Sequence, residues 1–250
     1  MTAKLDHNLV QRLAAHGDSN PRFKWYITTI VALSSFNFPE EIGPLYTHLL
    51  EQYIPPEDHA KETRKIKEAL VKAAGLHGAA KTGNAVRELY LSTPPHLVDN
   101  TCYRYGSTRT PLAMLAAYSH SSNDDEHTAA VARGDAFLKS LYRDVPDLNT
   151  EDDFVRKCCP DYFYVVSQLL YPHVFSFDKI LDKLESSQAI ITALISINCK
   201  GQAHNHMKGM MWNGATREEV ANIRDSIVLL AHHLGVQFRD GPVLVPADPN

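Results

Sequence analysis

The sequence predicts an all-α protein. Most of its 250 residues fall into segments in which apolar side chains recur about every three or four positions, the period of a helix that buries one face. Glycine, proline and Asn-Gly turns separate these segments. Strand signals are few, since only Val243-Leu244-Val245 has the short β-branched character of a strand.

Three helices are expected in the first half. Residues 26–38 are almost free of charge and predict a buried helix, too short for the roughly 20 apolar residues that cross a bilayer. Residues 57–74 alternate apolar and charged positions and predict an amphipathic helix that stops at Gly75. The helix is expected to resume over residues 83–91, before Pro94-Pro95. A basic cluster within the second helix, interleaved with Glu62 and Glu68, is interpreted as a solvated face; it is formed by Lys61, Arg64, Lys65 and Lys67.

The middle of the chain is expected to join two halves. Residues 119–127 are a polar run and predict a loop. A helix is expected over residues 128–141, followed by a turn that contains Pro146. Residues 161–170 are apolar and aromatic, and they predict a buried helix that stops before Pro172.

The last third carries the clearest helical pattern. Residues 178–198 have isoleucine and leucine at helical spacing, and a kink at 199–202 is expected before a short helix through Trp212. Thr216 followed by Glu219 forms the pattern of a capping box, which predicts the start of a final helix.

This final helix is expected to end at Gly235. We expect a single domain over residues 1–250 with an extended tail at 237–250, and two loosely repeated halves (1–120 and 128–236) as an open alternative.

Composition excludes several classes of protein. The net charge of −4 and the scattered basic residues argue against a nucleic-acid surface, and no run is long and apolar enough for a membrane span. Four cysteines without CxxC spacing are typical of reduced intracellular thiols. A cytoplasmic location is favoured, with a mitochondrial or peroxisomal one left open, although the last residues, Ala247 to Asn250, are no Ser-Lys-Leu signal.

One cluster of chemically active residues stands out, since Cys199, Gln202, His204 and His206 fall within eight positions. The two histidines lie about 200° apart around a regular helix, so they do not share a face. They also lack the i, i+4 spacing that places two metal ligands on one helical face. We therefore expect no metal here. The alternatives to a functional role are a surface histidine at position 204 and a buried structural thiol at position 199.

The stretch AHNHMKGMMWNGATREEVANIRDSIVLLAHHLG resembles the carboxymuconolactone decarboxylase and AhpD-like alkylhydroperoxidase superfamily. The resemblance is specific over Leu184–Gly235. It is looser over Arg64–Leu91, where KIKEALVKAAGLHGAAKTGNAVREL looks like the first half of the long, fungal-type members. It implies an AhpD-like helical bundle with an antiparallel helical hairpin core, no cofactor, and a homo-oligomer. The matching pattern residues are His206, Gly214, Thr216, Glu219 and Gly235.

The resemblance divides into two chemistries. The peroxidase branch uses a CxxC pair, and this chain matches only its first cysteine, Cys199, because Gln202 holds the second position. That branch also uses a glutamate, whose position falls near Ser187. A dithiol cycle needs a resolving thiol, which glutamine cannot supply. The decarboxylase branch keeps the histidine without the cysteines, so the chain is more similar to that branch.

The resemblance therefore implies cofactor-free decarboxylation or isomerisation of a small acidic organic substrate. His206 would be the proton donor or acceptor, because an imidazole titrates near neutral pH. Gln202 would donate to an oxyanion, and Cys199 would be its neighbour in the pocket. The candidate substrate-binding residues are His204, Lys200 and Lys208.

Two alternatives stay open. One is a thiol peroxidase that uses Cys199 alone with an external reductant. The other is a helical oligomer without catalysis that serves as a binding module. The expected partner in the enzymatic cases is a small molecule, with no nucleic acid and no membrane.

Overall fold

The computed structural model describes residues 5–18, 20–105 and 124–249, and within them the all-α prediction is confirmed. These residues form helices joined by turns and irregular segments, without a strand; Val243–Val245 lies in an irregular segment. The α-helices are α1 His7–Asp18, α2 Trp25–Phe36, α3 Ile42–Gln52, α4 His59–His77, α5 Ala79–Leu91, α7 Asp124–Leu141, α8 Phe154–Cys158, α9 Pro160–Tyr164, α10 Lys183–Ser196, α11 Lys200–Trp212 and α12 Arg217–His233. A π-helix, η5, covers Val165–Phe175, and short 3₁₀ turns are η1 Pro39–Glu41, η2 Pro56–Asp58, η3 Pro95–Leu97 and η4 Tyr103–Tyr105.

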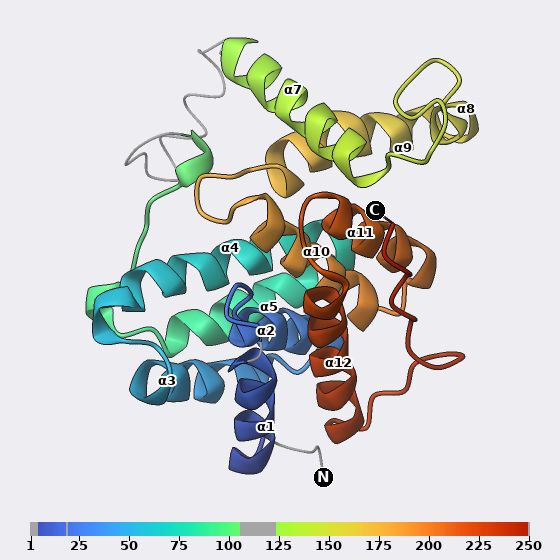
Figure 1. The fold of residues 1–250 in the computed structure, drawn as a ribbon. Coiled ribbons are helices and arrows are strands. Elements are labelled where there is room, and N and C mark those ends of the chain that lie inside the picture. The colour runs from blue at the N-terminus through green and yellow to red at the C-terminus, as the bar shows by residue number, and fades with distance from the viewer. Residues whose placement is uncertain (1–4, 19, 106–123, 250) are drawn as a thin grey trace.

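Two helices, α2 and α10, pack together at the centre of the fold (Figure 1). Residues 25–35 of α2 and 186–196 of α10 are all buried, which explains why both segments carry no charged residue on any side. The Gln188 amide of α10 donates to the Lys24 carbonyl and to Thr28 Oγ1, both at 2.9 Å. This polar link fixes how the two apolar helices face each other.

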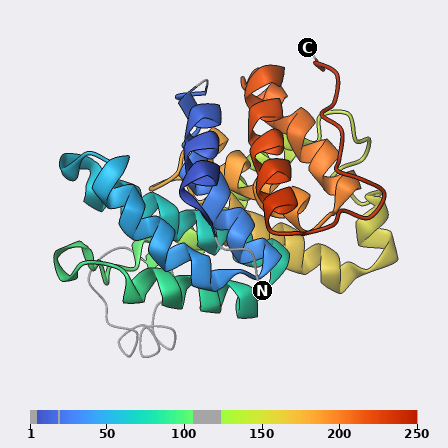
Figure 2. The ribbon, with the colours of Figure 1, turned by 90° about the horizontal axis from the view of Figure 1, so that it is seen from below.

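The other helices surround this pair. Helix α4 packs against both α2 and α10, α12 packs against α2, and α11 follows α10 as its hairpin partner. Helices α7, α8, α9 and η5 pack on one another beside α11. In Figure 2, the yellow segment that contains α8 and α9 lies at the edge of the fold away from α3. Within the described residues, no helix combines the length and apolar character needed to cross a bilayer.

The final hairpin agrees with its sequence signals. Thr216 Oγ1 accepts from the Glu219 amide, and the Glu219 carboxylate accepts from the Thr216 amide, so the predicted capping box is present. Helix α10 has a second capping box, between Asp182 and Glu185. Its start at Lys183 therefore lies five positions after the predicted one at residue 178. The tail after residue 237, predicted to be extended, is irregular and contains a turn at Asp240 and Gly241. Its carbonyls accept from Arg217 and Arg224 of α12.

Several predicted boundaries are wrong. Helix α4 continues through Gly75 to His77, and the break comes at Gly78, whose φ of +95° is a conformation that favours glycine. The kink predicted at 199–202 lies earlier, since Asn198 has a φ of +58° and α11 begins at Lys200.

The predicted polar loop at 119–127 is only partly testable. Residues 119–123 lie outside the described residues, and residues 124–127 already belong to α7. Acidic residues are favoured in the first turn of a helix, so polarity alone did not mark a loop at that end.

The helix predicted at 161–170 does not stop before Pro172. Pro160 begins α9, and η5 then continues through Pro172 to Phe175 as a π-helix. Because a π-helix bonds i to i+5, its ladder differs from the α-helical one that proline interrupts. The segment is also less buried than predicted: Tyr162 and Tyr164 are each more than half exposed, at 56% and 57%.

The interpretation of the charged face of α4 as solvated is also wrong in part. Glu62 and Glu68 are buried, and Lys65 forms an ion pair with Glu185 of α10. Their partners explain the burial, because a buried carboxylate must be hydrogen-bonded or paired. Tyr26 donates to Glu62 at 2.7 Å, and Arg104 pairs with Glu68 through its two terminal guanidinium nitrogens, at 2.9 and 2.7 Å.

Lys72 completes this buried cluster. Its side chain is 0% exposed, and its ammonium donates to the carbonyls of Val174, Phe175 and Phe177 at 3.1, 3.0 and 2.7 Å. It also lies 3.4 Å from the Glu68 carboxylate. Burial lowers the pKa of Lys72 to about 8. Lys72 therefore attaches the end of η5 to the core.

Candidate active site

Helix α11 places His206 on its buried face. Ala203, His206, Met207 and Met210 are buried, whereas His204 is exposed. This arrangement follows from helical geometry, because positions 204 and 206 point about 200° apart. His206 is therefore the only one of the two histidines that faces the interior.

A close approach between α11 and the end of α7 brings further groups to His206. A methyl group added at Gly209 would lie 2.7 Å from both Cα and the carbonyl oxygen of Leu141, which no side chain tolerates without a shift. Glycine at position 209 thus lets the backbones meet. Tyr142, the residue after Leu141, then reaches the His206 ring.

Two tyrosines hold the His206 ring. Nε2 of His206 lies 2.9 Å from the Tyr142 hydroxyl and 3.4 Å from the Tyr171 hydroxyl. The Tyr142 and His206 rings meet edge to face, with centroids 5.4 Å apart. The Tyr142 hydroxyl also donates to Oε1 of Gln202 at 2.6 Å. Gln202 and His206, one helical turn apart, therefore share Tyr142.

This network determines where the imidazole proton lies. A phenol has one proton, and Tyr142 donates it to Gln202. With that proton directed at Gln202, the Tyr142 oxygen is free to accept from Nε2 of His206, and this arrangement favours the tautomer with the proton on Nε2 and an unprotonated Nδ1. Nδ1 is buried and has no hydrogen-bond partner among the described residues. A buried lone pair of this kind is costly, and it often belongs to a site that a ligand or water completes.

Burial sets the charge state of the site. It lowers the pKa of His206 to about 4, so the ring is neutral at pH 7. Burial likewise raises the pKa of Tyr142 to about 12, and it raises the pKa of Tyr171 well above its usual value. The site therefore contains a neutral imidazole and two neutral phenols at physiological pH.

The other candidate residues lie around this core. Cys199 is half-buried just before α11 and is close enough to Tyr142 to contribute to its raised pKa. Lys208 forms an ion pair with Asp144, and Lys200 donates to the Asp240 carbonyl at 2.8 Å. The two lysines are thus engaged with the protein, and the role of each in substrate binding stays a prediction.

Tyr142 and Tyr171 were missed by the sequence analysis. They lie 64 and 35 positions before His206, at the end of α7 and within η5. No spacing rule links residues this far apart, and each tyrosine falls in a segment with an apolar pattern. Only the approach of α7 and η5 to α11 reveals them.

Metal ligation finds no support in the described part of the chain. There, no group of three or more histidine, cysteine, aspartate or glutamate side chains is placed to hold a metal ion.

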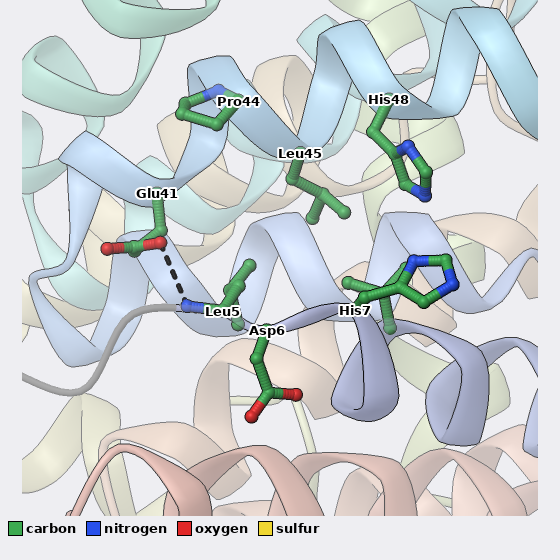
Figure 3. Close-up of a pocket in the computed structure, with 8 residues that line it drawn as sticks. Leu5, Asp6, His7, Glu41, Pro44, Leu45 and His48 are labelled. Carbon is green, nitrogen blue, oxygen red and sulfur yellow. Dashed lines mark hydrogen bonds between the residues drawn. The ribbon is translucent and has the colours of Figure 1, made fainter.

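Two cavities of about 200 Å³ are described, and His206 lines neither of them. The first lies between α1 and α3, where the His7 and His48 rings meet edge to face with centroids 5.9 Å apart (Figure 3). Glu41 at this cavity accepts from the Leu5 amide at 3.0 Å. The second lies against α7, η5 and α10. Its wall includes Phe137 and Phe175, which both contact Tyr171.

Comparisons with known proteins identify two relatives. No family model matches the chain, and no solved structure matches it. The chain is 26% identical over 214 positions to "Peroxisomal protein 2" of Schizosaccharomyces pombe, covering 86% of this chain and 88% of that protein. It is 24% identical over 276 aligned positions to "Peroxisomal protein 2" of Saccharomyces cerevisiae, covering 93% of this chain and 97% of that protein. The chain is thus similar, along most of its length, to two yeast proteins that share the name Peroxisomal protein 2.

Proposed function

We propose that this protein is a cofactor-free enzyme that moves a proton to or from a small enolisable acid, with His206 as the acid-base group. The observation that carries the proposal is the buried imidazole, whose Nδ1 has no partner while Nε2 is held by Tyr142. The resemblance to carboxymuconolactone decarboxylase-like proteins supports the same role for this histidine. The chemistry would be decarboxylation or isomerisation.

The charge of the substrate fits this site. A neutral imidazole with a pKa of about 4 is a weak base. A bound carboxylate nearby would favour the imidazolium and raise that pKa toward neutrality. Nδ1 would then accept a proton from the carbon next to a carbonyl and return it to another carbon. The Tyr142 oxygen accepts from Nε2 throughout, which stabilises the charge that develops on the ring.

The test is proton exchange with solvent. The wild-type protein is incubated in deuterium oxide with carboxymuconolactone and with a set of small β-keto acids, and loss of the enolisable C–H signal is followed by proton NMR. We expect exchange or carbon dioxide release above the buffer rate for at least one acid. A protein that leaves every acid at its buffer rate would contradict the proposal.

Two rivals are separated by companion assays. A thiol peroxidase at Cys199 predicts that the protein consumes peroxide in the presence of an external thiol and that Cys199→Ser abolishes this. A binding module without catalysis agrees with the position of His206 outside the two described cavities. It predicts no exchange with any acid.

We also propose that the protein works in the peroxisome, on the strength of the name that both relatives carry. The expected homo-oligomer stays a prediction, which light scattering coupled to size-exclusion chromatography would test.

Tyr142→Phe is expected to slow proton exchange by about tenfold or more, because it removes the acceptor that holds Nε2. The variant also lacks the hydroxyl that donates to Gln202. The imidazole is therefore expected to become a mixture of the two tautomers. Nitrogen-15 NMR of the histidine ring would measure that mixture. A purely structural role for Tyr142 would lower stability without changing the tautomer.

Tyr171→Phe is the matched control. Its hydroxyl lies 3.4 Å from Nε2, which is a weaker contact than the 2.9 Å of Tyr142. We expect a smaller loss of rate and an unchanged tautomer. A larger effect in Tyr171→Phe than in Tyr142→Phe would contradict the assigned network.

A further inference from the structure

The second cavity combines an apolar wall with charged groups. Its volume is about 200 Å³, and it lies where α7, the end of η5 and the start of α10 meet. Phe137, Phe175 and Ala136 provide the apolar wall. The polar lining consists of Arg133, Ser176, Asp178, Lys183 and Ser186.

Arg133 is fixed in place but carries no ion pair. Its Nε donates to the Ser176 carbonyl at 2.9 Å, and its Nη2 donates to the Pro172 carbonyl at 3.1 Å. These bonds hold the guanidinium against η5 and leave Nη1 without a bond to the described residues. No described carboxylate lies within ion-pair distance of Arg133. A preorganised guanidinium of this kind is suited to an anion.

Lys183 adds a second cation that makes no described hydrogen bond or ion pair. Partial burial lowers the pKa of Lys183, and the like charge of Arg143 lowers it further. Among the described residues of the lining, Asp178 is the one carboxylate, so two cations there face one anion. The cavity therefore has an excess positive charge that a ligand carboxylate would neutralise.

The cavity also adjoins the candidate active site. Tyr171 packs against Phe175 with ring centroids 5.2 Å apart and against Phe137 at 6.2 Å. The Tyr171 hydroxyl in turn lies 3.4 Å from His206 Nε2. One aromatic side chain thus separates the cavity wall from the imidazole.

We propose that this cavity binds a small monocarboxylate with a compact apolar body. The carboxylate pairs with Arg133 and Lys183, and the apolar body packs on Phe137 and Phe175. The volume of about 200 Å³ is smaller than the roughly 300–1,000 Å³ of sites for drug-sized ligands, which limits the ligand to a small acid. Binding requires no chemistry at His206, so this site stands whether or not the proposed enzymatic function does.

Binding is tested with benzoate and its neutral analogue benzamide, by isothermal titration calorimetry on the full chain. The two molecules have nearly the same shape, so the difference between them measures the charge. We expect benzoate to bind at least about tenfold more tightly than benzamide, and its affinity to fall as salt is added. Equal affinities, or no binding of benzoate, would overturn the proposal. Stronger binding of benzylamine would also overturn it, by pointing to Asp178 instead.

Variants locate the binding site. Arg133→Gln is expected to weaken benzoate binding about tenfold. Lys183→Gln is expected to weaken it about threefold, because the side chain is largely solvated and its pairing is screened. The Lys183 side chain is exposed, and its ammonium donates to no described backbone carbonyl. This variant is therefore expected to keep the fold even if Arg133→Gln does not. Lys179→Gln, an exposed neighbour that does not line the cavity, should leave binding unchanged.

His206→Gln separates the two proposals. It is expected to leave benzoate affinity unchanged.

Loss of benzoate binding in Lys179→Gln to the same extent as in Lys183→Gln would show a nonspecific charge effect and contradict the site.

Discussion

Replacing His206 with glutamine is expected to lower the rate of proton exchange with the substrate acid by a factor of about 100 to 10,000. The helix content of the protein is expected to stay the same. Glutamine has nearly the length of histidine, and its amide can still donate to the Tyr142 oxygen. It cannot take up and release a proton near neutral pH. The variant therefore removes the acid-base function and retains the hydrogen bond, which circular dichroism and the exchange assay would measure together.

The matched control is His204→Gln on the exposed face of the same helix. It makes the same chemical change two positions away, and we expect no more than about a twofold change in rate, since surface substitutions seldom disturb a fold. Full exchange activity in the His206 variant would remove the mechanism. Equal losses in both variants would show that the helix, and not the imidazole at position 206, is the sensitive element.

The second large effect is expected from Lys72→Met, which should lower the free energy of unfolding by about 3 kcal/mol or more. Methionine matches the apolar stem of lysine, so packing within α4 changes little. The loss comes from three carbonyls at the end of η5 and just after it, which lose their shared ammonium donor. Glu68 keeps its pair with Arg104, so it is not left as an unpaired buried charge. Urea unfolding followed by circular dichroism would measure the change.

Lys61→Met on the same helix is the control, because its ammonium is exposed and its ion pair with Asp58 spans 3.8 Å at the surface. Exposed pairs of this kind contribute about 0–1 kcal/mol. If Lys72→Met cost no more than Lys61→Met, the buried lysine would not attach η5 to the core, and the position of Tyr171 would need another explanation.

The helical architecture was predictable because its signals are local. The capping box at Thr216 and Glu219 and the apolar stripe of α12 lie within one segment, and the structure reproduces both. Glycine and proline were less reliable as signals of where a helix ends. Gly75 lies within a continuous helix, and Pro172 lies within a π-helix whose bonding pattern single-sequence periodicity does not anticipate.

The candidate site was only half predictable. His206 and Gln202 lie one turn apart on one helix, so their proximity could be read from the sequence. Their connection through Tyr142 depends on the close approach of Gly209 to Leu141, which joins elements far apart in the chain. The buried charges of Glu68 and Lys72 were missed for the same reason, because their partners, Arg104 and the end of η5, lie outside the helix that carries them.

Nitrogen-15 NMR of the His206 ring, followed from pH 3 to pH 8, measures the central claim most directly. A neutral ring at pH 7 with the proton on Nε2, an unprotonated Nδ1 and a pKa of about 4 would agree with the site described above. A small enolisable acid added at pH 7 should then raise that pKa. An imidazolium at pH 7, or a ring whose proton sits on Nδ1, would contradict it.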